Sequence, residues 1–167
     1  SRTPSADKQP NSYKSSKEKP MKVGIDLGSS NTVAALMSAE GRPVLVPDVN
    51  RLGDESTPTK ILLGKDRAFV GQFAERMVDA FPDQPMITQF KRHFGSTKAL
   101  AQFQGTPLSS EALAALLLRK IRHDVEINTS RPVELAVITA PAHFNDKQRK
   151  TILRAAEAEA YLAGREL

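Results

Sequence analysis

An aspartate, a glycine and two serines lie close together near the start of this sequence. Asp26 and Leu27 are followed by the turn-forming residues Gly28-Ser29-Ser30-Asn31. Glycine lets a backbone approach an anion, successive turn amides can point at phosphate oxygens, and hydroxyl groups add donors. A carboxylate beside a phosphate can also hold hydrated Mg²⁺, which usually keeps several of its waters. The spacing fits one half of a magnesium–phosphate site, and equally a plain hairpin whose aspartate bonds its own turn.

A second group with possible chemistry is the basic pair Lys91-Arg92, which follows Phe90. Taken alone, a short basic run favours a solvated surface. If Lys91 faces a terminal phosphate, the attraction across about 4 Å is roughly 4 kcal/mol per unit charge near a protein surface. An interaction of that size matters to a phosphoryl-transfer transition state.

A third segment runs from Val137 to Arg149 and joins a strand to a helix across a proline. Pro141 fixes the direction in which the chain leaves the strand, because its ring restricts φ. Arg149 comes on the first turn of the expected helix, where a guanidinium can bridge to a carboxylate or a phosphate. From the residues alone, a plain strand-to-helix connection remains the simpler interpretation.

Alternating and helical patterns predict the elements that must position these groups. Lys22–Leu27 alternates in polarity and is expected to form a hairpin with the strand Thr32–Met37. A helix is expected from a Ser109 cap to Asn128, and another opens at Asn145, with Gln148 completing a capping pair. Further strands are predicted at 44–46, 60–63, 68–70 and 133–139, the last central in its sheet, and a short helix at 71–80. The order predicts an α/β fold with a mixed sheet.

Composition and charge restrict the classes of function. The net charge is +5, but the first twenty residues contain five basic against two acidic side chains. Residues 1–20 are rich in Ser, Lys and Pro and are expected to form a disordered tail, with the domain beginning at Met21 and covering 21–167. The remainder has no clustered basic face, which argues against nucleic-acid binding. There are no cysteines and no apolar run of membrane-spanning length, so a cytoplasmic protein is expected.

Three segments together resemble the 70-kDa heat-shock protein family, the DnaK-like chaperones. They are residues 24–32, the Phe90-Lys91-Arg92 run, and residues 137–149 with their Pro-Ala-x-Phe-Asn-Asp-x-Gln-Arg core. Their order and relative placement match as well, and the resemblance extends from about Met21 to the C-terminus. It implies lobe I of an actin-like ATPase (ribonuclease-H-like) fold, incomplete relative to the family, in which ATP or ADP and Mg²⁺ lie between two lobes.

The resemblance also implies roles for individual residues. Asp26 would organise Mg²⁺ through water, and Lys91 would position the hydrolytic water and the γ-phosphate. Pro141 and Arg149 resemble a relay that couples nucleotide state to a substrate-binding domain. The first phosphate loop would consist of Gly28, Ser29, Ser30 and Asn31. A full-length protein of this kind would work in protein folding, with a J-domain co-chaperone, a nucleotide-exchange factor and unfolded clients as partners.

The sequence also departs from the family. Ser29-Ser30 stands where Thr-Thr is common, and His143 replaces a usual tyrosine. Nothing in the sequence matches the family's second phosphate loop, its second lobe or its peptide-binding domain. Because transition-state charge needs donors on both sides of the phosphates, this chain alone is expected to show little or no ATP turnover. Two alternatives are a non-catalytic remnant that docks onto a chaperone or co-chaperone, and a relative of the filament-forming actin and MreB proteins.

Overall fold

The computed structural model describes residues 19–50 and 54–165, with side chains described up to residue 160. The prediction of a disordered tail therefore falls almost entirely on residues outside this part. The elements in chain order are β1 Lys22–Leu27, β2 Asn31–Met37, β3 Pro43–Leu45, β4 Thr57–Pro58, β5 Ile61–Leu63, β6 Ala68–Val70, α1 Gln72–Met77, the 3₁₀ helix η1 Val78–Ala80, β7 Met86–Ile87, the 3₁₀ helix η2 Phe90–His93, β8 Ala99–Phe103, β9 Thr106–Ser109, α2 Ser110–Thr129, β10 Leu135–Thr139 and α3 Asp146–Arg165.

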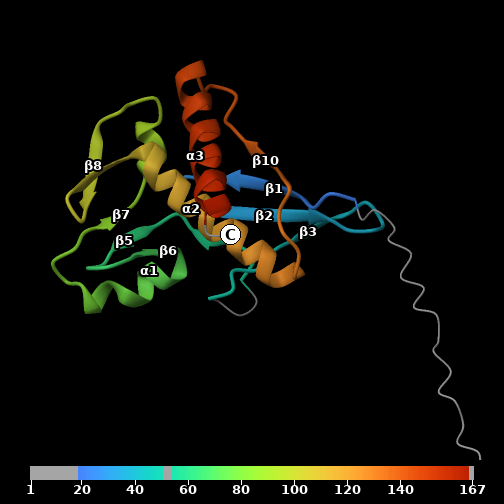
Figure 1. Cartoon of the computed structure of the whole chain (residues 1–167), viewed down its shortest axis with the longest axis horizontal. Coiled ribbons are helices and arrows are strands. Elements are labelled where there is room, and N and C mark those ends of the chain that lie inside the picture. The colour runs from blue at the N-terminus through green and yellow to red at the C-terminus, as the bar shows by residue number, and fades with distance from the viewer. Residues whose placement is uncertain (1–18, 51–53, 166–167) are drawn as a thin grey trace, which may run out of the picture.

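The main sheet is mixed, as predicted. Its strands lie in the order β10-β1-β2-β3, and β4 pairs with the first residues of β2 (Figure 1). β1 runs parallel to β10 and antiparallel to β2, so the carboxyl ends of β1 and β10 lie side by side. Two small sheets, β6-β5-β7 and β8-β9, complete the described fold. This is the mixed α/β class expected from the sequence.

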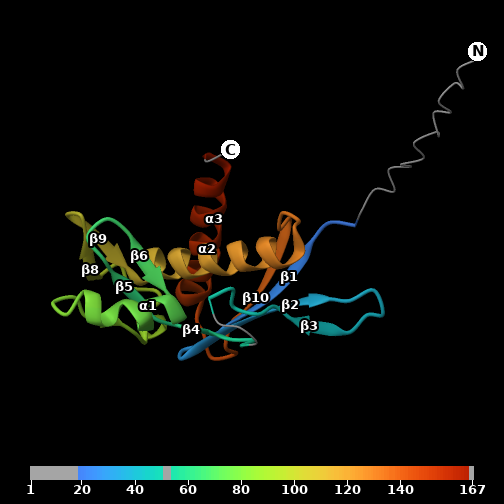
Figure 2. The same ribbon diagram turned by 90° about the horizontal axis from the view of Figure 1, so that it is seen from below.

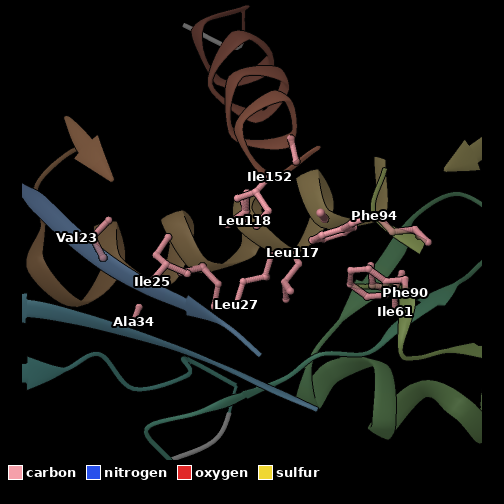
Figure 3. Packing of buried hydrophobic residues seen from close by; sticks show 14 of the residues in the cluster. Val23, Ile25, Leu27, Ala34, Ile61, Phe90, Phe94, Leu117, Leu118 and Ile152 are labelled. Carbon is pink, nitrogen blue, oxygen red and sulfur yellow. The ribbon is translucent and has the colours of Figure 1, made fainter. Parts of the chain in front are cut away.

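The core lies between the main sheet and α2. Alternate residues of β1 are buried, and Val23, Ile25 and Leu27 point toward α2 (Figure 3). α2 runs across the molecule and α3 crosses it, contributing Ile152 to the same cluster (Figure 2). Burying an aliphatic side chain of this size stabilises a fold by about 1.5–3 kcal/mol. The three buried residues of β1 therefore anchor the strand that carries Asp26 near its end.

Both helix starts follow the predicted capping. The Ser109 hydroxyl accepts a bond from the Ala112 amide at 3.4 Å at the start of α2. Before α3, the Asn145 amide donates to Gln148 Oε1 and the Gln148 amide donates to Asn145 Oδ1, each at 2.9 Å. The second arrangement is a reciprocal capping pair, which satisfies amides that a helix start leaves without an internal partner. The beginning of α3 is thereby fixed close to the end of β10.

The predicted central position of residues 133–139 in the sheet is wrong for the described chain. β10 is an edge strand, which pairs with β1 and with no other strand among the described residues. Leu135 is 48% exposed and Val137 is 63% exposed. An apolar strand composition indicates that both faces of the strand favour burial. It does not show whether the described residues provide the elements that would bury them.

The exposed side chains of β10 belong to a larger apolar surface. By strand register, Val137 lies across from Gly24, Gly24 from Ala35, and Ala35 from Leu45, all on the sheet face turned away from α2. Met37, two residues along β2 from Ala35, is 67% exposed and Leu45 is 39% exposed. We call this surface, formed by Leu135, Val137, Ala35, Met37 and Leu45, the open face.

The open face and the free edge of β10 predict concentration-dependent association, because such surfaces pair readily with other chains. We expect Val137→Lys to weaken this association several-fold by placing a charge on the edge strand. Ile127→Lys, at a 53% exposed position on α2, is the matched control and is expected to change little. Sedimentation velocity across a concentration series measures both. Association of Val137→Lys equal to that of the wild type would contradict the expectation.

The region between Lys60 and Ser109 contains more structure than the sequence patterns predicted. β5 and β6 lie where strands were expected, whereas the helix predicted at 71–80 divides into α1 and η1. β7, η2 and the hairpin β8–β9 were not predicted. The hairpin closes through Gln104 and Gly105, both with positive φ (51° and 79°). No helix formed by the described residues is both long and apolar enough to cross a membrane.

Candidate functional site

The candidate site begins at the turn between β1 and β2. An added Cβ on Gly28 would lie 2.0 Å from the Asn31 carbonyl oxygen, so the turn closes too tightly for any side chain at this position. Thr59 holds the turn from behind: its hydroxyl donates to the Gly28 carbonyl at 2.9 Å, and its amide donates to the Ser30 carbonyl at 2.9 Å. Thr59 was not among the predicted site residues.

These bonds determine which way the turn amides point. In a trans peptide the N–H and C=O groups point in opposite directions, and the described backbone contains no cis bond. Because the carbonyls of Gly28 and Ser30 face Thr59, the amides of Ser29 and Asn31 point away from it. The side chains of Ser29, Ser30 and Asn31 are exposed. The turn thus presents amides and hydroxyls on its outer side, as a phosphate cradle requires.

The Asp26 side chain bonds across the sheet and not to its own turn. It lies at the end of β1, directly beside Thr139 at the end of the parallel strand β10. The Thr139 hydroxyl donates to Asp26 Oδ1 at 2.9 Å. The turn itself has a backbone bond from the Gly28 amide to the Asp26 carbonyl at 3.1 Å. The simple hairpin interpretation, in which the carboxylate only bonds its own turn, therefore does not describe this side chain.

Lys91 reaches the same place from η2. Its Nζ donates to the Leu27 carbonyl, at the start of the turn, and lies 5.5 Å from the centre of the Phe144 ring. Burial lowers the pKa of Lys91, and the nearby Asp26 carboxylate acts in the opposite direction. The aromatic residues on either side of the basic pair explain its placement, because Phe90 and Phe94 are buried in the core and anchor η2. Lys91 therefore points inward, whereas Arg92 is exposed.

Pro141 and Arg149 lie on the segment that carries Phe144. The Phe144 amide donates to the Pro141 carbonyl at 3.0 Å, and Arg149 Nε donates to the Phe144 carbonyl at 3.2 Å. Arg149 thus braces the backbone of the connection between β10 and α3. His143, the residue that departs from the usual tyrosine, is exposed and packs edge-on against Phe144 at 5.3 Å. The three predicted segments are therefore neighbours: Lys91 bonds the Leu27 carbonyl of the first, and its ammonium group lies over the ring of Phe144, which belongs to the segment 137–149.

The arrangement fits a phosphate with a hydrated cation better than a bare metal ion. The described residues contain no group of three or more acidic, histidine or cysteine side chains that could hold a metal. A single carboxylate, a lysine and outward amides leave most cation ligands to water and phosphate oxygens, which is the usual pattern for Mg²⁺. The tightness of the turn at Gly28 keeps the backbone amides accessible to such an anion.

The fold and the site define a class of α/β proteins in which a strand–turn–strand hairpin, a lysine and the end of a parallel strand meet at one sheet edge. The family model described as Hsp70 protein matches residues 22–104 and 96–164. The chain belongs to the Hsp70 family.

Similar curated proteins are DnaK chaperones. The chain is 38% identical over 131 residues to the chaperone protein DnaK of Elusimicrobium minutum, a match that covers 77% of this chain and 21% of the relative. It is 36% identical over 138 residues to DnaK of Halobacterium salinarum, covering 81% of this chain and 21% of the relative. The chain thus spans about a fifth of the length of these relatives.

Proposed function

We propose that this chain forms the lobe I part of an actin-like (ribonuclease-H-like) nucleotide-binding domain and holds the phosphates of ATP or ADP together with Mg²⁺. The observation that carries the proposal is the convergence of three distant segments. Lys91 bonds the turn across 64 residues of sequence, and Thr139 bonds Asp26 across 113. A plain hairpin needs neither of these partners. Family membership adds a second, independent line of support.

The proposed roles follow from where each group points. The outward amides of Ser29 and Asn31, with the hydroxyls of Ser29 and Ser30, bind phosphate oxygens. Asp26 accepts hydrogen bonds from waters around the magnesium ion. When bound, Mg²⁺ supplies charge neutralisation to the phosphates. Lys91 stays close to this position because Leu27 and Phe144 hold its side chain, so its charge faces the terminal phosphate and the attacking water.

Pro141 and Arg149 are proposed as the relay of this lobe. Both bond to the backbone of Phe144, and the Phe144 ring is in contact with Lys91. A change in the position of Lys91 on nucleotide hydrolysis therefore has a short mechanical route to the start of α3. In a full-length chaperone, this route would report nucleotide state to a client-binding domain, with J-domain and nucleotide-exchange proteins acting on the same cycle. The division into a tail over 1–20 and a partial domain over 21–167 also remains a prediction.

One lobe supplies donors to one side of the phosphates. Electrostatic stabilisation of the transferred phosphoryl group depends on charges preorganised around it. We therefore expect weak nucleotide affinity and little or no ATP turnover from this chain alone.

Nucleotide titration tests the proposal. With magnesium and ADP added to the labelled chain, we expect the amide signals of Ser29 and Asn31 to shift in NMR spectra. Lys91→Met is expected to weaken the binding of magnesium and ATP, whose γ-phosphate Lys91 is proposed to face, about tenfold, which corresponds to about 1.4 kcal/mol. Lys98→Met, at an exposed position outside the site, is the matched control. Strong hydrolysis by the wild-type chain would contradict the expected inactivity.

Unchanged Ser29 and Asn31 signals at saturating magnesium–ADP would reject the phosphate site itself. That result would favour the second candidate, a remnant that docks onto a chaperone or co-chaperone. The observation in favour of this candidate is the open face, an apolar surface of the kind that marks protein–protein contacts.

A further inference from the structure

We propose that Thr139 is a positioning residue for Asp26 and makes nucleotide binding dependent on magnesium; this inference rests on the proposed function. The two residues are direct neighbours in the parallel pairing of β1 with β10. The Thr139 Oγ1 donates a hydrogen bond to Asp26 Oδ1 at 2.9 Å. The carboxyl ends of parallel strands meet at one edge of a sheet, which is where α/β proteins bind ligands.

The bond restricts the rotation of an exposed carboxylate. Threonine is β-branched and stiff at χ1, so its hydroxyl is a well-placed donor. With Oδ1 of Asp26 held in this way, the carboxylate is oriented before a hydrated cation arrives. Preorganisation of this kind raises affinity because less conformational freedom is lost on binding. An aspartate without this partner would have to be ordered by the cation itself.

The Thr139 side chain contributes little to the fold. It is exposed on an edge strand, and the pairing of β1 with β10 rests on a backbone ladder from Lys22 to Asp26. The hydroxyl points to the carboxylate that is proposed to face the cation, on the sheet face opposite the core. A role in folding alone would be better served by an apolar β-branched residue, such as valine, at this position.

Thr139 also connects the two charged groups of the site. It is the last residue of β10, and the chain then leads through Pro141 to Phe144, whose ring contacts Lys91. A single short segment therefore orients Asp26 by its first residue and supports Lys91 by its last. The geometry of the carboxylate relative to the ammonium group depends on this segment.

The test compares Thr139→Val with Thr139→Ser. ADP affinity is measured by NMR titration with excess magnesium and, separately, with EDTA. We expect Thr139→Val to weaken magnesium–ADP binding three- to tenfold and to leave binding in EDTA unchanged, whereas Thr139→Ser keeps the wild-type ratio of the two affinities. Thr106→Val, at an exposed threonine on β9, is the matched control and should leave both affinities unchanged.

The outcomes separate the two proposals. If Thr139→Val lowers the ADP affinity by the same factor in magnesium and in EDTA, or lowers neither affinity, the positioning role is overturned and the phosphate site is left intact. A wild-type chain whose ADP binding is the same with and without magnesium would overturn this inference, and a wild-type chain without ADP binding would overturn both. Thermal unfolding of all variants controls for folding. If Thr139→Val does not fold, Thr139→Ser decides: a ratio of magnesium to EDTA affinity below that of the wild type overturns the positioning role.

Discussion

Gly28→Ala is expected to abolish the nucleotide-dependent shifts at the turn and to lower the free energy of unfolding by about 2–4 kcal/mol, in the range of strongly destabilising backbone substitutions. The new methyl group would lie 2.0 Å from the oxygen and 3.2 Å from the carbon of the Asn31 carbonyl. These are backbone atoms, so the conflict cannot be relieved by a side-chain rotation. Thr59 and Lys91 also hold the turn at its Gly28, Ser30 and Leu27 carbonyls, which prevents it from opening without further losses.

Gly24→Ala is the matched control, since Gly24 lies on β1, four residues before the turn glycine. An added Cβ there meets its nearest atom, the Ala35 carbonyl oxygen, at an ordinary 3.8 Å. We expect this variant to equal the wild type or to gain a few tenths of a kcal/mol, because alanine restricts the unfolded chain more than glycine does. Urea denaturation and magnesium–ADP titration measure both variants. A Gly28→Ala protein with wild-type stability would show that the turn is looser than the structure indicates.

The second large effect is expected at a buried charge cluster. Lys120 Nζ lies between two carboxylates: it contacts Asp48 Oδ1 at 2.6 Å and also bonds Asp124 Oδ2. The Asp48 side chain is fully buried and accepts further bonds from the Asn50 amide at 2.9 Å and the Thr57 hydroxyl at 3.4 Å. Asp124 is 3% exposed, and its Oδ1 has no hydrogen-bond partner among the described residues. One lysine thus pairs with two buried carboxylates, of which Asp48 accepts additional hydrogen bonds and Asp124 has an oxygen without a partner in the described part of the chain.

Asp48→Asn is therefore expected to destabilise the protein by about 2–4 kcal/mol, because one carboxylate oxygen becomes a buried NH₂ group, and the side chain can no longer accept all the bonds that Lys120, Asn50 and Thr57 donate to Asp48. Asp124→Asn is expected to be neutral or to stabilise by up to about 1 kcal/mol at pH 7, because it removes a poorly compensated buried charge while Lys120 keeps Asp48. The two substitutions have the same chemistry and are each other's control. Equal destabilisation by both, measured by urea denaturation at pH 7, would contradict this account.

The pH dependence provides a further check on Asp124. Burial raises the pKa of Asp124, and the hydrogen bond from Lys120 opposes this effect in part. A raised carboxyl pKa means that the folded state binds the proton more tightly than the unfolded state. The resulting stabilisation is complete below the ordinary pKa of an aspartate and is lost as pH rises through the folded-state value. We therefore expect the stability difference between wild type and Asp124→Asn to shrink as the pH is lowered from 7 toward 4.

The predictions from sequence succeeded where a local pattern decides the structure. The alternation in β1 reports one buried face, and the Ser109 and Asn145 caps are set by side chains within three residues of the amides they bind. The edge position of β10 could not be read in this way, because strand order is a property of distant pairing. The hairpin β8–β9 was missed because its strands are short, although Gln104-Gly105 is a turn signal that could have located it.

The site shows the same division. Asp26 and Gly28 are two residues apart in sequence, and their turn chemistry can be argued from composition. That Lys91 belongs beside them came from resemblance to a family, since no periodic pattern links residues 64 positions apart. Thr59 and Thr139 were missed, although a polar residue at the end of a strand parallel to β1 is a signal that could have found Thr139. The cluster of Lys120 with Asp48 spans 72 residues and has no local signal.

The pairing of β1 with β10 has a consequence for the order in which the protein is made. β1 must wait for β10, because Thr139, the partner of Asp26, lies 113 residues later in the chain. At a translation rate of about 5–20 residues per second, this delay is roughly 6–23 s. During most of that time, until α2 (Ser110–Thr129) has been made, the β1–β2 hairpin can form but the apolar side chains that β1 presents to α2 lack their cover. The nascent chain therefore exposes its own future core before the proposed nucleotide site can be completed, and in that interval it resembles a chaperone client.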